Sequence, residues 1–485
     1  MGVHASTRRE FFSRTLVAAG TALVAQGCAT GTKAGRHAAA RRKPNFIIIL
    51  TDDQGYNDVG CFGSPNIKTP NLDRMAAEGM KFTDFHVSAP VCTPSRASLM
   101  TGCYSQRVGL AATPNKDGNL EPPSYVLFSH SKCGINPDEV TIAEALKGLG
   151  YATGCVGKWH LGHLPPFLPT RNGFDSYYGI PYSNDMLPSM LMRNEEVIEE
   201  PVEQDTLTER YTEEAVRFIT EHKEQPFFLY LPHNMPHTPL HVSQKFAGQS
   251  AGGLYGDVVE CIDWSVGRVL DTVRDCGLEE NTVILFTSDN GPWLIRGEDG
   301  GFATPLRAGK GTTYEGGMRV PCIMRWKGHI PAGSTCGELA TTMDLLPTFV
   351  QLAGGAPPTD RIIDGKDLWS LMSGTPGAVS PHEAFYYYFG QELHAVRSGP
   401  WKLRLESTLR DEDIYRPGLN RKDVKIPPAL YNLQNDVGEQ KNVYDDHKEV
   451  VERLMVLVEK AREDLGDSRT GRVGKGVRPV GMVAE

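Results

Sequence analysis

The chain has 485 residues, of which 22% are charged and 40% hydrophobic, and this ordinary balance excludes the disordered and fibrous classes. Its length allows one large domain with a sizeable core and a smaller second domain. The formal net charge of -9 argues against a whole-chain electropositive field for nucleic acid, so we expect no nucleic-acid partner, and any anionic ligand must meet a local cluster of basic side chains.

Residues 1–28 are typical of an export signal rather than of a folded element. A basic region containing Arg8 and Arg9 is similar to a bacterial twin-arginine signal, and an apolar stretch follows over residues 16–25. A membrane-spanning helix is disfavoured because this stretch is too short to cross a bilayer. Cys28 ends a weak lipobox. We therefore expect export in a bacterium, to the periplasm or the cell surface as a lipoprotein, with membrane contact only through an N-terminal lipid.

Beyond a predicted linker over residues 29–43, strand and helix patterns alternate. Unbroken apolar runs, which suit strands buried on both faces of a parallel sheet, occupy 46–50, 227–231 and 283–286, with a weaker run over 151–156. Helical patterns lie over 141–150 (opened by a Thr141–Glu144 capping box), 211–222, 258–276 and 341–352, where we expect Pro347 to kink the helix. This alternation predicts an α/β domain over residues 44–380, with a large, mainly parallel central sheet flanked by helices.

The pattern changes after residue 380. Short strand-like runs occupy 384–389, 394–397 and 401–405, with a turn at 398–400, and a helical pattern follows over 446–465. We predict a C-terminal subdomain over residues 381–470, built as a smaller antiparallel sheet plus a helix. Residues 471–485 are expected to form a tail.

Two of the apolar runs end in oxygen-bearing side chains. Asp52 and Asp53 follow the first run, and Asp289 and Asn290 follow the run at 283–286. Oxygen ligands select hard cations such as calcium or magnesium, and three converging carboxylates would repel one another without a cation. Ligands bind beyond the carboxyl ends of strands in such folds, so the sequence predicts a divalent metal site there. Either dipeptide alone is more commonly a turn or cap.

The stretch Cys92-Thr93-Pro94-Ser95-Arg96 predicts a helix start that can hold an anion. Thr93 is a candidate N-cap and Pro94 a suitable first helical residue, which places Cys92 at the N-terminus, where free N–H groups favour negative charge. Arg96 falls in the first turn, where its guanidinium can clamp two oxygens of a tetrahedral anion. The alternative is a buried structural thiol before a helix.

These residues resemble the formylglycine-dependent sulfatases of the alkaline-phosphatase superfamily, in the arylsulfatase A-like branch. Cys-x-Pro-Ser-Arg is that family's modification signal, and 150–160, 309–321 and 429–433 are also similar to family motifs. The resemblance implies an alkaline-phosphatase-like fold that hydrolyses sulfate esters of glycans or small aryl alcohols. It also implies calcium, with magnesium as the alternative, and a maturation enzyme that makes formylglycine from Cys92.

The resemblance also implies a role for each matching residue. Hydrated formylglycine at position 92 would supply two hydroxyls, one to attack sulfur beside the metal and one whose deprotonation expels sulfate. The implied metal ligands are Asp52, Asp53, residue 92, Asp289 and Asn290. The implied catalytic groups are Arg96, Lys158 and Lys310 on the sulfate, His237 or Lys310 on the leaving oxygen, and His160 on the second hydroxyl.

Other readings stay open. Taken alone, each Lys is a surface residue and each His a core or solvent-facing one, and we expect His233 and His241 to lie outside the site. Residues 183–186 are weaker candidates for contacting the substrate. One alternative is a phosphodiester or phosphonate monoester hydrolase, whose substrate is an ester with a similar single negative charge. The non-catalytic alternative is a glycan-binding protein built on an inactive sulfatase fold. The cysteines other than Cys28 and Cys92 show no zinc spacing, although an exported protein can pair some of them.

Overall fold

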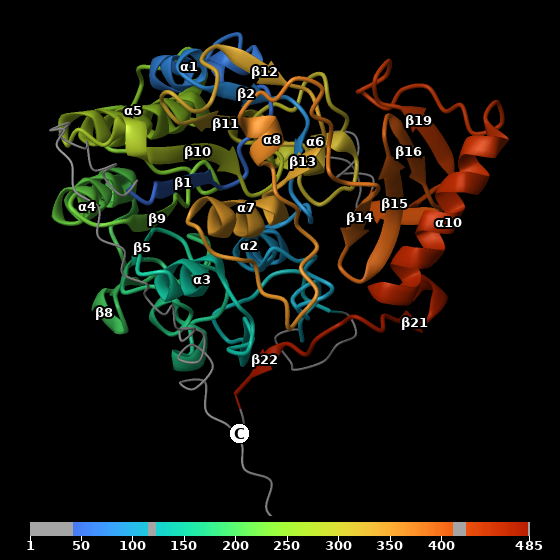
Figure 1. Cartoon of the computed structure of the whole chain (residues 1–485), viewed down its shortest axis with the longest axis horizontal. Coiled ribbons are helices and arrows are strands. Elements are labelled where there is room, and N and C mark those ends of the chain that lie inside the picture. The colour runs from blue at the N-terminus through green and yellow to red at the C-terminus, as the bar shows by residue number, and fades with distance from the viewer. Residues whose placement is uncertain (1–41, 115–122, 411–422, 484–485) are drawn as a thin grey trace, which may run out of the picture. The chain divides into compact units, whose positions relative to one another are not determined.

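The computed structural model describes residues 42–114, 123–410 and 423–483 (Figure 1). The predicted export signal, with Arg8, Arg9 and Cys28, and most of the predicted linker lie outside the described residues. Within the described part of the chain, no helix combines the length and the apolar character needed to cross a membrane.

A ten-stranded sheet forms the centre of the fold. In spatial order its strands are β12 (Ser334–Cys336), β2 (Met80–Phe82), β11 (Cys322–Arg325), β10 (Thr282–Ser288), β1 (Asn45–Thr51), β9 (Phe227–Pro232), β5 (Ala152–Val156), β6 (Ser176–Gly179), β7 (Leu191–Arg193) and β8 (Glu196–Glu199). The five strands from β10 to β6 pair in parallel, and β11, β7 and β8 join in antiparallel fashion. The four predicted apolar runs are all central strands, as expected for strands covered on both faces.

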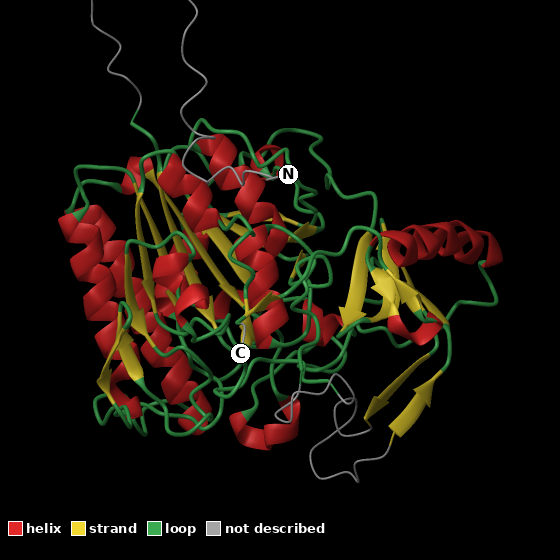
Figure 2. Cartoon of the chain, turned by 90° about the horizontal axis from the view of Figure 1, so that it is seen from below, coloured by secondary structure: helices red, strands yellow, loops and turns green. Residues whose placement is uncertain are grey.

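Helices cover both faces of this sheet, as Figure 2 shows. Side chains of β1 alternate, with Phe46, Ile48 and Leu50 in one core and Ile47 and Ile49 in the other. The first core contains α2 (Cys92–Thr101), α3 (Ile142–Gly148) and α7 (Leu345–Leu352), and the second contains α1 (Pro70–Ala77), α4 (Leu207–Glu221) and α5 (Gly253–Asp275). Two further helices, α6 (Glu315–Met318) and α8 (Trp369–Met372), have only four residues each. The predicted α/β class is confirmed.

The helix predicted over 341–352 differs from expectation. A 3-10 turn over Thr342–Asp344 precedes α7, so Pro347 falls in the first turn of that α-helix. A proline in the first turn removes no intrahelical hydrogen bond, so the reason for expecting a kink at this position does not hold. The capping box of Thr141 and Glu144 opens α3 as predicted.

A smaller antiparallel sheet follows in the C-terminal part. It contains β14 (Phe385–Phe389), β15 (Glu392–Ser398), β16 (Trp401–Arg404) and β19 (Ala429–Asn432), and α10 (Lys448–Asp464) packs against it (Figures 1 and 2). Short pairs complete the described strands, namely β3 (Phe85–His86) with β13 (Ala340–Thr341), β17 (Ser407–Arg410) with β18 (Asp423–Ile426), β20 (Gly466–Asp467) with β21 (Arg472–Val473), and β4 (Cys133–Gly134) with β22 (Gly481–Met482). The last pair joins the C-terminal segment to residues that precede α3.

Buried ion pairs connect the two sheets. Asp84 accepts two hydrogen bonds from Arg397 of β15, at 2.8 and 2.5 Å. Lys402 of β16 lies 2.9 Å from both Glu315 of α6 and Glu439. We call these five residues the inter-sheet charge network. Because all of them are buried, each depends on its partners for the hydrogen bonds that water would otherwise provide.

Candidate active site

The carboxyl ends of β1 and β10 bring the predicted metal ligands together. The two strands pair in parallel with Thr51 opposite Ser288, so the residues that follow them are neighbours. The Asp289 amide donates to the Thr51 carbonyl at 3.0 Å, and the Asp53 amide donates to Asp289 Oδ1 at 3.2 Å. All four candidate ligands from the strand ends, Asp52, Asp53, Asp289 and Asn290, are buried.

Unusual backbone geometry positions other site residues. Asp53 and His160 have φ of 64° and 61°, in the left-handed region that non-glycine residues rarely adopt and that concentrates at functional sites. Gly157 has φ of 133°, and a Cβ there would lie 1.9 Å from the Pro232 carbonyl oxygen at the end of β9. Glycine at this position allows the close approach in which the Lys158 amide donates to that carbonyl at 2.7 Å.

Cys92 is the first residue of α2 and is only 2% exposed. Its Sγ lies 3.5 Å from Asp52 Oδ1. The N-cap is Val91, so the prediction that Thr93 caps this helix is wrong. The Thr93 hydroxyl instead accepts from the Leu127 amide at 3.0 Å and donates to the His160 carbonyl at 3.2 Å, which ties the start of α2 to the segment that carries His160.

Three cations pair with the three carboxylates. The shortest contacts are Lys158 Nζ to Asp52 at 2.5 Å, Lys310 Nζ to Asp53 at 2.8 Å, and Arg96 to Asp289 at 2.8 Å. The formal charges of the six side chains therefore cancel. A bound divalent cation would give this buried group a net positive charge, which favours an anionic ligand.

The ionisation of two aspartates differs sharply although they adjoin in sequence. Burial opposes ionisation of Asp52, but Lys158 and Arg96 outweigh it and hold the pKa of that carboxyl well below its usual range. Burial raises the pKa of Asp53 to about 7, because Lys310 only partly offsets burial and the charge of the nearby carboxylates. The surroundings of Asp53 therefore stabilise a negative charge less well than the surroundings of Asp52 do.

The residues present fit a hard divalent cation. Ligand atoms of Asp52, Asp53, Cys92 and His237 lie within 4.8 Å of one another, and the predicted ligand Asp289 is not part of this group. The Asn290 amide nitrogen donates to Asp53 Oδ1 at 2.7 Å, so its oxygen points elsewhere, and this buried oxygen has no hydrogen-bond partner among the described residues. A buried acceptor without a donor beside several carboxylates is the arrangement that a calcium or magnesium ion would satisfy.

A second buried group, Asp84, His86 and Glu315, also has metal-binding side chains close together. Its carboxylates already face cations, since Arg397 pairs with Asp84 and Lys402 with Glu315. The first group has comparable ion pairs, but it also lies beside Cys92 and the unpartnered oxygen of Asn290, which the second group lacks. We therefore interpret the second group as structural.

The hydrogen bonds of His237 define its protonation pattern. The Asn184 side-chain nitrogen donates to the Pro239 carbonyl at 2.9 Å, which turns its oxygen toward His237 Nδ1 at 3.1 Å. Nδ1 therefore carries the proton, and Nε2 faces Asp53 at 3.7 Å. Burial, aided by Lys310, lowers the pKa of His237 well below its usual value, so Nε2 carries no proton in this state.

His160 presents the opposite tautomer. Its Nε2 lies 2.9 Å from the Leu127 carbonyl oxygen, which can only accept, so Nε2 carries the proton. The buried Nδ1 has no partner among the described residues. Burial, reinforced by Lys158 and Arg96, lowers the pKa of this imidazole well below its usual value. His160 thus offers a neutral, unoccupied acceptor.

Other candidates separate as follows. His233 contacts Ser265 at 3.3 Å and His241 pairs with Asp205 at 2.8 Å, so neither joins the site. In the weaker candidate segment 183–186, Ser183 does join it. The Ser183 hydroxyl lies 3.2 Å from Lys158 Nζ and 3.4 Å from His237 Nδ1.

The sequence reading missed Trp293, which contacts two site residues. Its ring centroid lies 5.3 Å from that of His237 and 4.3 Å from Lys310 Nζ. The only feature of the sequence that pointed to Trp293 was its position three residues after Asn290. Nearness in sequence does not show in which direction a side chain points.

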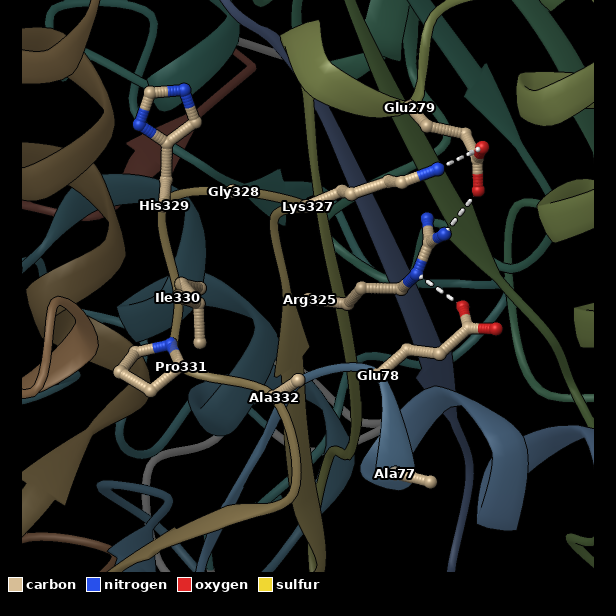
Figure 3. A pocket seen from close by; sticks show the side chains of 10 residues that line it. All are labelled: Ala77, Glu78, Glu279, Arg325, Lys327, Gly328, His329, Ile330, Pro331 and Ala332. Carbon is tan, nitrogen blue, oxygen red and sulfur yellow. Dashed lines mark hydrogen bonds and ion pairs between the residues drawn. The ribbon is translucent and has the colours of Figure 1, made fainter.

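A separate cavity lies at the other end of β10. Its volume is about 610 Å³. Its charged side chains face one another (Figure 3), with Arg325 donating to Glu78 at 2.8 Å and Lys327 to Glu279 at 2.9 Å. Because β11 runs antiparallel to β10 and Arg325 pairs with Ile284, this cavity lies toward the amino end of β10, away from Asp289. Its size does not make it the reactive site.

Comparison with known proteins agrees with this geometry. A family model described as Sulfatase matches residues 44–356, and one described as the C-terminal region of aryl-sulfatase matches residues 380–480. The chain is 38% identical over 464 residues to N-acetylgalactosamine-6-sulfatase of Rattus norvegicus, covering 88% of this chain and 87% of the relative. It is 38% identical over 442 residues to arylsulfatase A of Homo sapiens, covering 84% of each.

Solved structures give the same result. A structure titled Ps i-CgsB superposes with a TM-score of 0.72 at 31% identity, covering 86% of this chain and 92% of that one. The PsFucS1 sulfatase from Pseudoalteromonas sp. superposes with a TM-score of 0.76 at 26% identity, covering 86% and 90%. The family, the fold class and the class of enzyme predicted from the motifs are confirmed: this chain belongs to the sulfatase family, whose members hydrolyse sulfate esters.

Proposed function

We propose that this sulfatase acts through a formylglycine made from Cys92 and a calcium ion held by Asp52, Asp53, Asp289 and Asn290. The observation that carries the proposal is the position of Cys92, buried at the first residue of α2 with Sγ 3.5 Å from Asp52. Burial and the Asp52 charge raise the pKa of the thiol, which makes it a poor nucleophile, and a soft sulfur suits a hard cation badly.

The two absent groups would supply the chemistry that the unmodified chain lacks. Hydrated formylglycine supplies two hydroxyls on one carbon, one to attack sulfur and one whose loss of a proton expels sulfate and restores the aldehyde. Calcium, held by the ligand carboxylates, would supply positive charge that stabilises an attacking oxygen. With the carboxylates turned to a cation, Arg96, Lys158 and Lys310 can direct donors at the three terminal sulfate oxygens.

Proton transfers fall to residues already oriented for them. The unoccupied Nδ1 of His160 is the candidate acceptor for the proton of the second hydroxyl, because its other nitrogen is committed to the Leu127 carbonyl. Lys310 and His237 remain the two candidates to protonate the leaving oxygen. Lys310 carries its proton in the present state, since the neighbouring Asp53 charge outweighs burial and raises its pKa, whereas His237 must first gain one at Nε2.

For the substrate we propose a sulfated glycan or an aryl sulfate. The names of two relatives, N-acetylgalactosamine-6-sulfatase and arylsulfatase A, support these classes. A further structure of Ps i-CgsB is titled as a complex with a neocarrahexaose, which supports a saccharide. The likeness to the phosphonate monoester hydrolase of Agrobacterium radiobacter, at 18% identity, concerns the fold alone.

The proposal is tested by mass spectrometry of protein co-expressed with a formylglycine-generating maturation enzyme. With the oxidant supplied by the maturation enzyme, the β-carbon of Cys92 should be oxidised by two electrons, release its sulfur as sulfide and become an aldehyde that reacts with hydrazines. Metal analysis of the same protein should find about one bound calcium ion per chain. Cys92→Ala should abolish sulfate release. A fully active preparation whose Cys92 is still an alkylatable thiol would overturn the formylglycine mechanism.

Two assays separate the alternatives. Faster turnover of an aryl phosphodiester than of an aryl sulfate would favour a phosphoester hydrolase. A protein that carries unmodified Cys92 and no metal after maturation, but binds sulfated sugars, would favour the non-catalytic reading. We also propose a catalytic domain over residues 44–380 and a C-terminal subdomain over 381–470, a division that the two family-model ranges support.

A further inference from the structure

We propose that Trp293 and Arg296 form a subsite on the leaving-group side of the active site, where Arg296 binds a second anionic group of the substrate. This inference rests on the proposed function, because it needs an ester whose sulfate occupies the buried cations. It adds a substrate class to that function, namely sulfate esters whose alcohol part itself carries a carboxylate or another sulfate.

The burial of the surrounding residues gives the direction in which a leaving group must extend. The groups assigned to the sulfate are deeply buried, with Lys158 and Arg96 at 0% exposure. Lys310 is the least buried of the three cations, with 9% of its side chain exposed. Trp293, which contacts Lys310, is half-buried, and Arg296 is exposed. The part of the ester that points away from the sulfate therefore passes these two residues on its way to solvent.

The backbone holds Trp293 firmly in that place. Gly291 packs so tightly that a Cβ would lie 1.8 Å from the Gly316 carbonyl oxygen, and its amide donates to the Gly317 carbonyl at 3.1 Å. The next residue, Pro292, accepts a hydrogen bond from the Lys310 amide at 2.9 Å. The segment between Asn290 and Trp293 thus links the metal site to the proposed subsite with little freedom.

Arg296 is held against the Trp293 ring. Its guanidinium carbon lies 4.0 Å from the ring centroid, and its amide donates to the Trp293 carbonyl at 2.9 Å. Lys310 Nζ lies 4.3 Å from the same centroid, so the two cations are at most about 8 Å apart, the sum of the two distances. One monosaccharide with two anionic substituents can bridge such a separation.

Arg296 also differs from the other cations of the site in having no carboxylate partner. Arg96, Lys158 and Lys310 each pair with an aspartate. No carboxylate among the described residues forms an ion pair with Arg296, although Glu298 and Asp299 follow it on the same exposed turn, Leu294–Asp299. An exposed guanidinium stacked on an aromatic ring keeps its hydrogen-bond donors available for a carboxylate or sulfate.

The test compares two aryl sulfates that differ by one charge, 3-carboxyphenyl sulfate and the methyl ester of the same compound. The wild-type enzyme should show the lower KM for the carboxylate. Arg296→Ala should raise the KM for the carboxylate about fivefold more than the KM for the methyl ester, the effect expected of a partly exposed ion pair, with kcat little changed. Arg296→Lys should keep part of the preference.

The matched control is Arg268→Ala, which removes another exposed arginine that stacks on a tryptophan, Trp264 of α5, at 5.6 Å. It should leave the ratio of the two KM values unchanged. An unchanged ratio in Arg296→Ala, or an equal loss for both compounds, would overturn the subsite and leave the sulfatase mechanism standing. Failure of wild-type enzyme with formylglycine in place to hydrolyse either compound, or the 6-sulfate and 4,6-disulfate of N-acetylgalactosamine, would contradict the proposed substrate classes as well.

Discussion

At the scale of single residues, His237 is held in a defined tautomer by Asn184, and this has a kinetic consequence. If His237 protonates the departing oxygen, His237→Ala should reduce kcat/KM for a sugar sulfate by roughly 100-fold or more, the range typical of a lost general acid. The loss for 4-nitrophenyl sulfate should be much smaller, because nitrophenolate leaves without a proton. Steady-state rates on both compounds make the comparison.

The control for this variant is His241→Ala, a partly exposed histidine outside the site that pairs with Asp205. It should change neither rate. An equal loss for both leaving groups in His237→Ala would assign proton donation to Lys310, which already holds its proton in the present state.

Metal dependence is a second prediction at this scale. Asp53→Asn keeps the size of the side chain but removes one of the three carboxylate charges, so bound calcium and nearly all sulfate release should be lost while the fold persists. Metal analysis and circular dichroism together check this result. Asp205→Asn, which changes an exposed carboxylate, should retain calcium. Full activity of the wild-type protein in a strong chelator, with no metal bound, would contradict the site.

At the scale of elements, the inter-sheet charge network joins α6 to the small sheet. Lys402→Met would leave Glu315 and Glu439 buried without their shared cation, and we expect a loss of about 3–5 kcal/mol in the free energy of unfolding. The midpoint of denaturant unfolding would measure it. Lys460→Met, which affects a pair with more than half of each side chain exposed, should shift that midpoint little.

A double variant sharpens this prediction. Adding Glu439→Gln to Lys402→Met removes one of the stranded charges and should recover part of the lost stability. If Lys402→Met unfolds at the same denaturant concentration as the wild-type protein, the network does not hold the sheets together.

The sequence predicted the elements whose signal is local. β1 and β10 are unbroken apolar runs that end in Asp52-Asp53 and Asp289-Asn290, so both the strands and the convergence of their ends could be predicted. The predicted N-cap of α2, Thr93, was wrong because the Thr93 hydroxyl forms hydrogen bonds with residues far along the chain rather than with its own helix. The local sequence does not show whether a side chain will bond to its own helix or to a distant residue.

Long-range partners were beyond prediction for the same reason. Glu315 and Lys402 are separated by 87 residues, and only the folded chain brings them to 2.9 Å. Trp293 and Arg296 have ordinary side chains in a turn, and their relevance depends on where Lys310 lies. The proposed catalytic groups could be predicted from the sequence only because their motifs resemble those of a known family.

At the scale of the whole molecule, the N-terminal segment should determine location. Arg8→Lys with Arg9→Lys should block export, because the proposed signal depends on the arginine pair. Cys28→Ala should release the mature protein from the membrane if a lipid is attached there. Fractionation of cells into cytoplasm, membrane and periplasm distinguishes these outcomes. Membrane association that persists in the Cys28 variant would remove the lipid anchor and leave export standing.

The complete burial of α2 determines the order in which Cys92 modification and folding can occur. All ten residues of the helix are buried, and Cys92 is 2% exposed, so a second protein cannot close around this side chain once the fold is complete. Any enzyme that modifies Cys92 must therefore act on the chain after its synthesis and before it has folded. The fraction of active molecules would then depend on the rate of Cys92 modification relative to the rate of folding. A variant that folds faster would leave a larger fraction of its molecules unmodified and therefore inactive.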